Sequence, residues 1–382
     1  MDVGQPNSPS LLFLYDGEYG GDNGVSSYIR TIGEYVANQG VAVEYMVGKN
    51  SSDEPHVISP SKSVAVRGNG STSFVPLYTP KRHITHELER IQPDAVHVQL
   101  PFASSMSGQV IKQLGRGTSL VGTFHTPMPH GWLRAANQVN ARVTRNEMKR
   151  FDQFFSVSEA AQIAAKTIYN VDSEILPCPI NLEQAQNNID ISNYDTNKTT
   201  VSFLGRLTPR KGAMNFITGL ELVKPTLQDQ LAIQLIGDGE ERQHLEQRVI
   251  ASTLHNKTHF TGKVTGIPKY NLLAKSDIVV CPSVGGESFG IILLEAMATQ
   301  RPVVLASNIN GYSEVMRDVP EALIAKDDPT VLARRIETLI DDPSERQRIF
   351  HAQQEVVNKF DIRQIIGPAL MKAYGFTGEG TQ

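Results

Sequence analysis

The sequence predicts an α/β protein with two doubly wound, Rossmann-like domains that face a central cleft. Three observations support this fold class. Short apolar runs typical of buried strands alternate with segments of helical periodicity along the chain. The alternation stops at one polar stretch and then starts again. A chain of 382 residues is also too long for one ordinary core.

The first half of the chain contains strand-like runs separated by helical segments. Each run is short and apolar, which is typical of a strand in a parallel sheet that helices cover. The glycine-rich DGEYGGDNG separates the first run from a helical pattern that Gly40 closes. The strand-like runs are 11–15, 41–47, 95–100, 119–126 and 154–158.

A polar stretch at 183–200, EQAQNNIDISNYDTNKTT, divides the chain and has the composition of a linker. After it, the strand-like runs TVSFLGRL, LAIQLIG, THFTG, DIVVCPS and RPVVLAS alternate again with helical segments. We therefore expect a first domain at 1–180, a linker at 181–199 and a second domain at 200–359. The last helical pattern, about 360–376, is interrupted only by Gly367-Pro368, and we expect it to pack back onto the first domain.

The composition excludes several classes of protein. Hydrophobic residues make up 40% and charged residues 20%, and the net charge of −4 argues against nucleic-acid binding by counterion release. The two cysteines, Cys178 and Cys281, suggest neither a disulfide framework nor a zinc site. MDVGQPNSPS lacks the features of a signal peptide, and no run approaches 18 apolar residues. We expect a cytoplasmic protein, with peripheral membrane contact left open.

The segment GGESFGIILLEAMA at 285–298 carries two carboxylates. The pattern predicts a helix that begins near Ser288, with Gly285 and Gly286 in the turn before it and Glu287 at its N-terminus. A phosphate or a sugar hydroxyl could bind at such a terminus, but Glu287 could equally cap the helix. Glu295 lies two turns further on in an apolar run, where a buried carboxylate needs a hydrogen-bond partner. A bound ribose diol would supply that partner.

The segment SFLGRLTPRKG at 202–212 ends a predicted strand at Gly205 and then presents three cations. Such a cluster at the carboxyl end of a strand is typical of a diphosphate-binding loop, although solvated basic loops are common. We assign Arg206 and Lys211 to the diphosphate. Arg210 could equally point to water.

Three further segments give weaker signals. Gly237 lies in LIGDGEE, where a strand, a glycine turn and a helix follow one another. His125 follows a predicted strand, where a substrate contact is favoured over a satisfied core histidine. Gly20, Gly21 and Gly24 form a glycine-rich loop before a helix, but their spacing is not that of a dinucleotide-binding fingerprint.

Together these segments resemble the GT-B glycosyltransferases of family 4. The resemblance is strongest over about 200–315, where FLGRLTPRKG, LIGDGEE, HFTGKV, SDIVVCPS, GESFGIILLEAMA, RPVV and GYSEV follow one another in the family's order. Glu287 and Glu295 form its E-x7-E pair. Within the family, GGESFG and FHT at 124–126 are most similar to the bacterial phosphatidyl-myo-inositol mannosyltransferases. Gln300 departs from the pattern, which usually has a glycine there.

The resemblance implies a nucleotide-sugar donor, with GDP-mannose favoured, held mainly by the second domain. Arg206 and Lys211 would hold the diphosphate, Glu295 the ribose and Glu287 the hydroxyls of the transferred sugar. The donor set would also include Gly24 near the phosphate and Gly237, and His125 would lie near the sugar. Backbone groups of the segment after Glu287 would approach the sugar or the phosphate. That segment comprises Ser288, Phe289, Gly290 and Ile291.

The implied reaction is an α-glycosyl transfer that retains the anomeric configuration. Glu287, His125, Arg206 and Lys211 form the implied catalytic set. Fixed cations and a helix N-terminus would stabilise the negative charge on the departing diphosphate. The sequence contains no D-x-D motif, and the family requires no metal cofactor, which still leaves room for a loosely bound Mg²⁺.

The acceptor is a separate question. WLRAANQVNARVTRNEMKR at 132–150 has cations on one predicted helical face and apolar residues beside them, which suits an anionic membrane at the inner face of the cell membrane. An ordinary exposed helix fits equally well. The cations are Arg134, Arg142, Arg145 and Lys149, and the apolar residues are Trp132, Leu133, Val139 and Val143.

We therefore expect a retaining mannosyltransferase that uses GDP-mannose and acts on a lipid such as phosphatidyl-myo-inositol. The alternative within the family uses a UDP-sugar and a polysaccharide or soluble acceptor. Two other classes are disfavoured. The complete set of Arg206, Lys211, Glu287 and Glu295 argues against a silent binding module, and the irregular glycine loop argues against an NAD-dependent enzyme.

Overall fold

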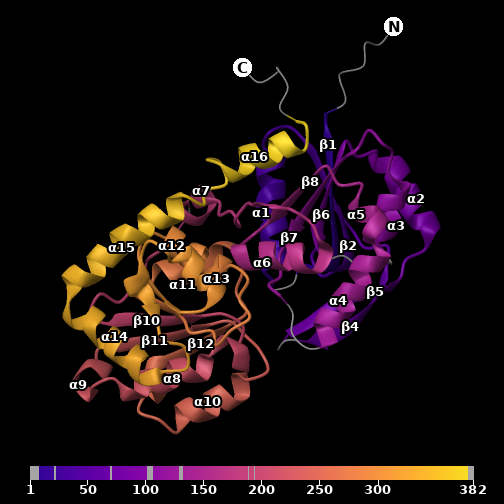
Figure 1. Cartoon of the computed structure of the whole chain (residues 1–382). Helices are drawn as coiled ribbons and strands as arrows, with labels where there is room; N and C mark the ends of the chain where they lie inside the picture. The colour runs from indigo at the N-terminus through magenta and orange to yellow at the C-terminus, as the bar shows by residue number, and fades with distance from the viewer. Residues whose placement is uncertain are drawn as a thin grey trace. The chain divides into compact units, whose positions relative to one another are not determined.

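The computed structural model describes residues 8–20, 23–68, 71–100, 106–128, 132–187, 189–192 and 194–376. The chain forms two compact units, whose elements Figure 1 labels. Unit 1 contains the described residues up to Pro179 together with those from Ile362 onward, and unit 2 contains Ile180–Asp361. The stretch 181–199, expected as a linker, is therefore grouped with unit 2. The last helix, α16 (Ile366–Ala373), is grouped with unit 1.

Unit 1 is built on a parallel sheet with the strand order β3-β2-β1-β6-β7-β8-β9. Every residue of β6 is buried, and Leu11 to Leu14 of β1 have no exposed surface. Because helices cover both faces of such a parallel strand, its sequence is a short continuous apolar run, as predicted. The strands are β1 (Ser10–Tyr19), β2 (Ala42–Asn50), β3 (Val57–Ile58), β6 (Ala95–Leu100), β7 (Ser119–Phe124), β8 (Gln153–Ser156) and β9 (Glu174–Ile175).

Unit 2 is built on a second parallel sheet with the order β12-β11-β10-β13-β14-β15. Its strands β13 and β14 consist of buried residues throughout. The predicted α/β fold class with two doubly wound units is confirmed. The strands are β10 (Thr199–Leu204), β11 (Leu231–Ile236), β12 (Thr258–Gly262), β13 (Ile278–Cys281), β14 (Val303–Ser307) and β15 (Leu323–Ile324).

Helices connect the parallel strands in both units (Figure 1). Among the described residues, no helix is both long and apolar enough to cross a membrane. The helices of unit 1, besides α16, are α1 (Gly24–Ala37), α2 (Lys81–Ile91), α3 (Ser107–Gln113), α4 (Trp132–Val143), α5 (Arg145–Met148), α6 (Glu159–Ala164) and the π-helical η1 (Ala165–Tyr169). Those of unit 2 are α7 (Leu182–Gln186), η2 (Pro209–Lys211), α8 (Ala213–Leu222), α9 (Pro225–Gln228), α10 (Arg242–Ile250), η3 (His255–Lys257), α11 (Gly266–Ala274), α12 (Ile291–Ala298), α13 (Asn310–Val315), η4 (Pro320–Ala322), α14 (Pro329–Asp341) and α15 (Pro343–Asn358).

The strand orders define one topological switch point in each sheet. It lies between β1 and β6 in unit 1 and between β10 and β13 in unit 2. Ligands of doubly wound folds bind beyond the carboxyl ends of the strands at such a point. In unit 2, the segments that follow the two switch-point strands are 205–212 and 282–290. These are the segments that carry the predicted cations and Glu287.

A hairpin of β4 (Lys62–Gly68) and β5 (Ser71–Tyr78) interrupts the alternation in unit 1. Pro76 of the hairpin is buried and lies close to Gly48 of β2. Leu77 next to it is 70% exposed, and Val64 and Val66 of β4 are exposed as well. The hairpin was not predicted, because its strands do not bury a continuous apolar run.

The final segment differs from the prediction in one respect. The helical pattern at 360–376 forms a helix only from Ile366, and Gly367-Pro368 lies inside its first turn rather than interrupting it. A proline is tolerated there because the first N–H groups of a helix have no acceptor within it.

Tyr374, which follows α16, attaches that helix to the sheet of unit 1. Its hydroxyl lies 2.7 Å from Nδ1 of His97 on β6, and the other ring nitrogen of His97 lies 2.7 Å from the hydroxyl of Thr123 on β7. All three side chains are buried. Burial lowers the pKa of His97 to about 3, so its ring is neutral and satisfied by two hydroxyl groups.

Tyr194 holds the polar stretch of unit 2 against its sheet. Its hydroxyl donates to both carboxylate oxygens of Asp277 at 2.8 Å, and the guanidinium of Arg301 lies 3.6 Å from the centre of its ring. Asp277 also accepts the backbone N–H of Thr200 at 2.9 Å. A stretch with the composition of a linker is thereby tied to β10 by polar contacts.

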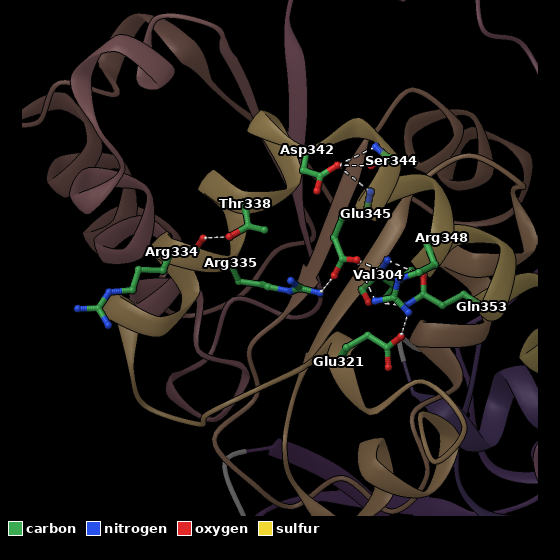
Figure 2. Close-up of polar contacts among 10 residues, drawn as sticks. All are labelled: Val304, Glu321, Arg334, Arg335, Thr338, Asp342, Ser344, Glu345, Arg348 and Gln353. Carbon is green, nitrogen blue, oxygen red and sulfur yellow. Dashed lines mark hydrogen bonds and ion pairs between the residues drawn. The ribbon is translucent and has the colours of Figure 1, made fainter.

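Helix α15 is joined to β14 by a buried amide, as Figure 2 shows. The side chain of Gln353 accepts from Val304 N at 2.9 Å and donates to Val304 O at 2.7 Å, and it has no exposed surface. At the other end of α15, Asp342 accepts the N–H groups of Ser344 and Glu345 at 3.0 Å and so caps the helix.

Arginine–glutamate pairs link the start of α15 to α14 and to η4 (Figure 2). Glu345 accepts from Arg335 of α14 at 3.0 Å and from Arg348 at 2.9 Å, and Arg348 reaches Glu321 at 2.6 Å. Arg348 is largely exposed, so these pairs fix local geometry more than they contribute to stability.

We expect replacement of Gln300 by glycine to stabilise unit 2. Gln300 lies just after the C-cap of α12, Thr299, and has φ 56°, a left-handed conformation that costs a residue with a Cβ about 1 kcal/mol relative to glycine. Gln300→Gly should therefore raise the free energy of unfolding by about 1 kcal/mol in urea titrations. Gln300→Ala keeps the Cβ and serves as the control. Equal stability of the two variants would contradict the assignment of strain.

Candidate active site

The segment between β10 and α8 brings two cations to the end of β13. The short helix Pro209–Lys211 carries them, and Gly212 ends it with φ 74°. A Cβ on Gly212 would overlap the carbonyl oxygen of Pro282, so only glycine allows the two segments to approach so closely. The approach places Arg210 and Lys211 beside the segment that follows β13.

Glu287 lies at the centre of the resulting polar cluster, which we call the Glu287 cluster and which comprises Arg210, Lys211, Ser283 and Glu287. Its Oε1 lies 2.6 Å from Nη1 of Arg210 and 2.8 Å from Nζ of Lys211. Ser283 donates its hydroxyl to the same oxygen at 3.1 Å. Arg210 also donates to the carbonyl oxygens of Gly285 and Gly286 at 3.1 and 3.3 Å. The alternative that Arg210 points to water is therefore wrong.

The electrostatics of the cluster keep Glu287 ionised. Burial alone would raise the pKa of this carboxyl, but the attraction of Lys211 and Arg210 and the hydrogen bonds outweigh burial and lower it. The side chains of Glu287 and Lys211 are 12% and 13% exposed. Two cations and one carboxylate leave a net positive charge, which suits an anionic ligand such as a diphosphate.

Helix α12 begins later than predicted, and this changes the interpretation of Glu287. The helix starts at Ile291, and its N-cap is Gly290 with φ 119°. Glu287 therefore lies in the preceding loop, so the prediction of a helix from Ser288 with Glu287 at its N-terminus is wrong. A Cβ on Gly290 would lie 2.7 Å from the ring of Tyr312, which explains why a glycine breaks the helical pattern here.

Glu295 finds a different partner from the one expected. It lies within α12, is 6% exposed and accepts from Nζ of Lys269 at 2.7 Å. Lys269 comes from α11, and its side chain is 16% exposed. The buried carboxylate is therefore compensated by an ion pair in the protein alone, and a ribose diol is not needed to explain it.

The other predicted donor residues of unit 2 lie around the carboxyl ends of β10, β11 and β13. A Cβ on Gly237 would overlap the carbonyl oxygen of Gly205, which precedes Arg206, so the first two strand ends are tightly apposed. Arg206 is half-buried. Ser288, Phe289, Gly290 and Ile291 form the loop and the first residue of α12, whose first-turn N–H groups have no acceptor within the helix.

Two predicted residues belong to unit 1. Gly24 is the first residue of α1, and Asn23 caps that helix by accepting the N–H of Ser26 at 2.8 Å. Gly21 of the predicted loop lies outside the described residues.

His125 follows β7 and is 8% exposed. Its Nε2 lies 2.7 Å from Oε1 of Gln99, and its ring meets the ring of Tyr28 edge-on at 4.7 Å. Burial lowers the pKa of His125 to about 3, so the ring is neutral near pH 7. Such a ring can exchange hydrogen bonds with a sugar but cannot neutralise a phosphate.

Sequence reasoning did not single out Ser283, Tyr312 or Lys269. The first two lie inside the quoted motifs SDIVVCPS and GYSEV, but nothing in the spacing shows that their hydroxyls meet. Lys269 lies in a different helix from Glu295, so no periodicity connects the two. Within the described parts of the chain, no group of three or more His, Cys, Asp or Glu residues is placed to hold a metal ion.

Two family models match the chain. Residues 22–184 match the model described as "Glycosyltransferase Family 4", and residues 184–356 match "Glycosyl transferases group 1". The Glu287 cluster and Glu295 lie within the second match.

Several proteins of other organisms resemble the chain over most of its length. A phosphatidyl-myo-inositol mannosyltransferase of Mycobacterium leprae is 27% identical over 92% of both chains. One of Mycolicibacterium smegmatis is 26% identical over 92% of this chain and 89% of its own length. Among solved structures, sucrose-phosphate synthase from Thermosynechococcus elongatus is similar to this chain with a TM-score of 0.72 and 18% sequence identity. The match covers 96% of this chain and 98% of the synthase. That likeness supports the fold alone.

We expect the stability contributed by Glu287 to depend on pH. Because the pKa of Glu287 is lowered in the folded protein from its ordinary value of 4.5, its contribution is present above pH 4.5 and is lost as the pH falls through the folded value. Wild type should therefore lose unfolding free energy more steeply than Glu287→Gln below pH 4.5, as measured in urea titrations at each pH.

Asp229→Asn provides the control for this measurement, since it removes a carboxylate that is 81% exposed and pairs with Lys257. Its pH dependence should follow that of wild type. Parallel curves for wild type and Glu287→Gln down to pH 3 would show that the cations do not stabilise this carboxylate.

Proposed function

Because the chain belongs to the glycosyltransferases, we propose that it transfers mannose from GDP-mannose to a phosphatidyl-myo-inositol lipid with retention of the anomeric configuration. The observation that carries the proposal is the likeness to phosphatidyl-myo-inositol mannosyltransferases over 92% of the chain. The Glu287 cluster supports it, because the cluster provides the charges that this chemistry needs at the switch point of unit 2.

The proposed reaction exchanges one bond at the anomeric carbon. The bond to the diphosphate breaks and the diphosphate takes the electron pair, while the acceptor hydroxyl oxygen bonds to the same face of the sugar. The acceptor proton passes to the departing phosphate oxygen. Arg206 and Lys211 would stabilise the charge on the diphosphate, and Arg210 is added to this set because it lies in the same cluster. Glu287 would accept hydrogen bonds from hydroxyls of the transferred sugar.

The remaining donor contacts are assigned through the resemblance. Glu295 would bind the ribose, the N–H groups before and at the start of α12 would approach the sugar or the phosphate, and Gly237 would line the base of the site. In unit 1, Gly24 would contact the phosphate, and neutral His125 would hydrogen-bond with the sugar. No metal is required in this scheme, and Mg²⁺ would assist only as a loosely bound ion.

The proposed acceptor is a lipid, so the enzyme would work at the inner face of the cell membrane. The basic segment predicted for membrane contact forms two helices, α4 and α5, separated at Thr144, so its cations do not share one helical face as predicted. They remain exposed, and Val139 and Val143 beside them are 58% and 61% exposed. Exposed cations next to exposed apolar side chains favour an anionic membrane surface.

Product analysis tests the proposed donor and acceptor together. We expect incubation with GDP-mannose and phosphatidylinositol vesicles to yield a mannosylated lipid by mass spectrometry, with an α-linkage by NMR. UDP-glucose, UDP-N-acetylglucosamine and ADP-glucose should be used at less than about one hundredth of that rate. Consumption of a UDP-sugar with a soluble product would establish the alternative within the family instead.

Matched lysine variants provide the controls for that assay. Lys211→Met should lower kcat by about 100-fold, because loss of one group that stabilises transition-state charge costs that much. Lys257→Met removes another lysine of unit 2 that is paired with a carboxylate, and it should leave kcat unchanged. Both variants should remain folded by circular dichroism. Normal turnover in Lys211→Met would remove this residue from the mechanism.

Vesicle flotation tests the membrane contact. Arg142→Glu with Arg145→Glu should reduce binding to vesicles with 30% phosphatidylinositol by about tenfold, because two attractive charges become repulsive. Lys326→Glu with Arg334→Glu makes the same change in charge at exposed positions of unit 2 and should bind like wild type. Equal losses in the two double variants would show that only net charge matters.

A further inference from the structure

The two oxygens of the Glu287 carboxylate have different surroundings. Arg210, Lys211 and Ser283 all contact the carboxylate at Oε1. Two of the three donors are cations on the loop after β10, and the third is a neutral hydroxyl at the end of β13. The protein therefore holds the carboxylate through Oε1, and Oε2 takes part in none of these three contacts.

Two hydroxyl groups, of Ser283 and Tyr312, form a hydrogen-bond relay that leads to Oε1. The hydroxyl oxygens of Ser283 and Tyr312 lie 3.1 Å apart. Ser283 has one hydroxyl hydrogen, and an ionised carboxylate only accepts, so Ser283 must donate to Glu287 and accept from Tyr312. The directions of both hydrogen bonds are thus fixed, and the relay ends on Oε1.

The two hydroxyl residues of the relay are more deeply buried than the two cations. Tyr312 has no exposed surface and Ser283 is 1% exposed, whereas the side chain of Arg210 is 23% exposed. Close packing fixes the position of Tyr312 as well. A Cβ on Gly290 would lie 2.7 Å from its ring, and a Cβ on the neighbouring Gly311 would lie 2.7 Å from the carbonyl oxygen of Glu287. The start of α13 is therefore pressed directly against the loop that carries Glu287.

In the proposed reaction, Arg210 and Lys211 interact with two anionic groups, the Glu287 carboxylate and the donor diphosphate. In the protein alone, Arg210 and Lys211 neutralise Glu287. A donor diphosphate carries more negative charge than one carboxylate and accepts several hydrogen bonds, so it draws the same cations toward itself. Glu287 then loses part of the attraction that holds it at the moment when its position relative to the sugar matters.

We propose that Ser283 and Tyr312 are positioning residues for the transfer reaction, which keep the Glu287 carboxylate oriented toward the sugar while Arg210 and Lys211 bind the diphosphate. The proposal rests on the proposed function of the Glu287 cluster. Neither residue touches the donor in this scheme. Both act through Oε1, so their loss should impair turnover and leave the affinity for a nucleoside diphosphate without a sugar unchanged.

The experiment uses the full-length enzyme and three variants: Ser283→Ala, Tyr312→Phe and the double variant. Tyr312→Phe keeps the ring that packs against Gly290 and removes only the hydroxyl. We expect kcat with the nucleotide sugar to fall about tenfold in Ser283→Ala and about threefold in Tyr312→Phe, since a hydrogen bond to a charged group is lost directly or weakened. The double variant should equal Ser283→Ala, because Tyr312 acts through Ser283.

Isothermal titration calorimetry measures the dissociation constant for GDP, and for UDP if the enzyme prefers UDP-sugars. This measurement separates a positioning role from a structural one, because damage to the fold would weaken nucleotide binding as well. The dissociation constant should stay within about twofold of wild type in all three variants. Ser202→Ala is the matched control, because it removes a buried hydroxyl of β10 that lies 2.7 Å from the hydroxyl of Ser276. It should leave both kcat and the dissociation constant unchanged.

Several results would overturn the proposal. Normal kcat in Ser283→Ala would do so, and so would a loss of nucleoside diphosphate affinity that matches the loss of kcat. A double variant whose defect is the product of the two single defects would show that the two hydroxyls act independently. Failure of glycosyl transfer itself is recognised separately, since wild type would then turn over none of the nucleotide sugars, although the binding measurements could still be made.

Discussion

The approach of the loop after β10 to the end of β13 is the constraint on which the candidate site depends. It places Arg210 and Lys211, two adjacent cations, in partly buried positions where each repels the other. Glu287 stabilises the approach, because it enters the same space and accepts from both cations through one oxygen. Removing the carboxylate would leave two poorly hydrated charges together, which is far more costly than losing an exposed ion pair. The electrostatics that hold the two loops together are thus the ones that the proposed chemistry would use.

Glycines make this approach sterically feasible, and each does so for a local reason. Gly212 lets one loop touch the backbone at Pro282, and Gly237 does the same between the ends of β10 and β11. Gly290 has no Cβ and therefore leaves room for the ring of Tyr312 at the end of the loop before α12. A motif rich in glycine therefore does more here than leave room for a ligand. It lets three strand ends and one helix start come close enough for their polar groups to meet.

The sequence was sufficient for those features in which one segment determines its own environment. Apolar runs such as 95–100 and 119–126 identified the buried parallel strands, because such strands need a covered surface along their whole length. It was insufficient where the partner lies far away in the chain. The hairpin of β4 and β5 leaves several apolar side chains exposed, the start of α12 depends on the ring of Tyr312, and Lys269 approaches Glu295 from another helix. Each of these depends on tertiary contacts, which periodicity does not contain.

Glu295 shows how such a missed contact changes the interpretation of a residue. A buried carboxylate in an apolar helix needed a partner, and a ligand diol was one solution, but Lys269 already supplies it at 2.7 Å. An ion pair of this kind holds the carboxylate ionised and oriented before any ligand arrives. If a diol binds there, its hydroxyls need only the remaining lone pairs of the carboxylate, because one ammonium group cannot occupy all of them. The ion pair and the proposed ribose contact are therefore compatible. Without a bound diol, Lys269 still compensates the buried charge of Glu295 in this apolar helix.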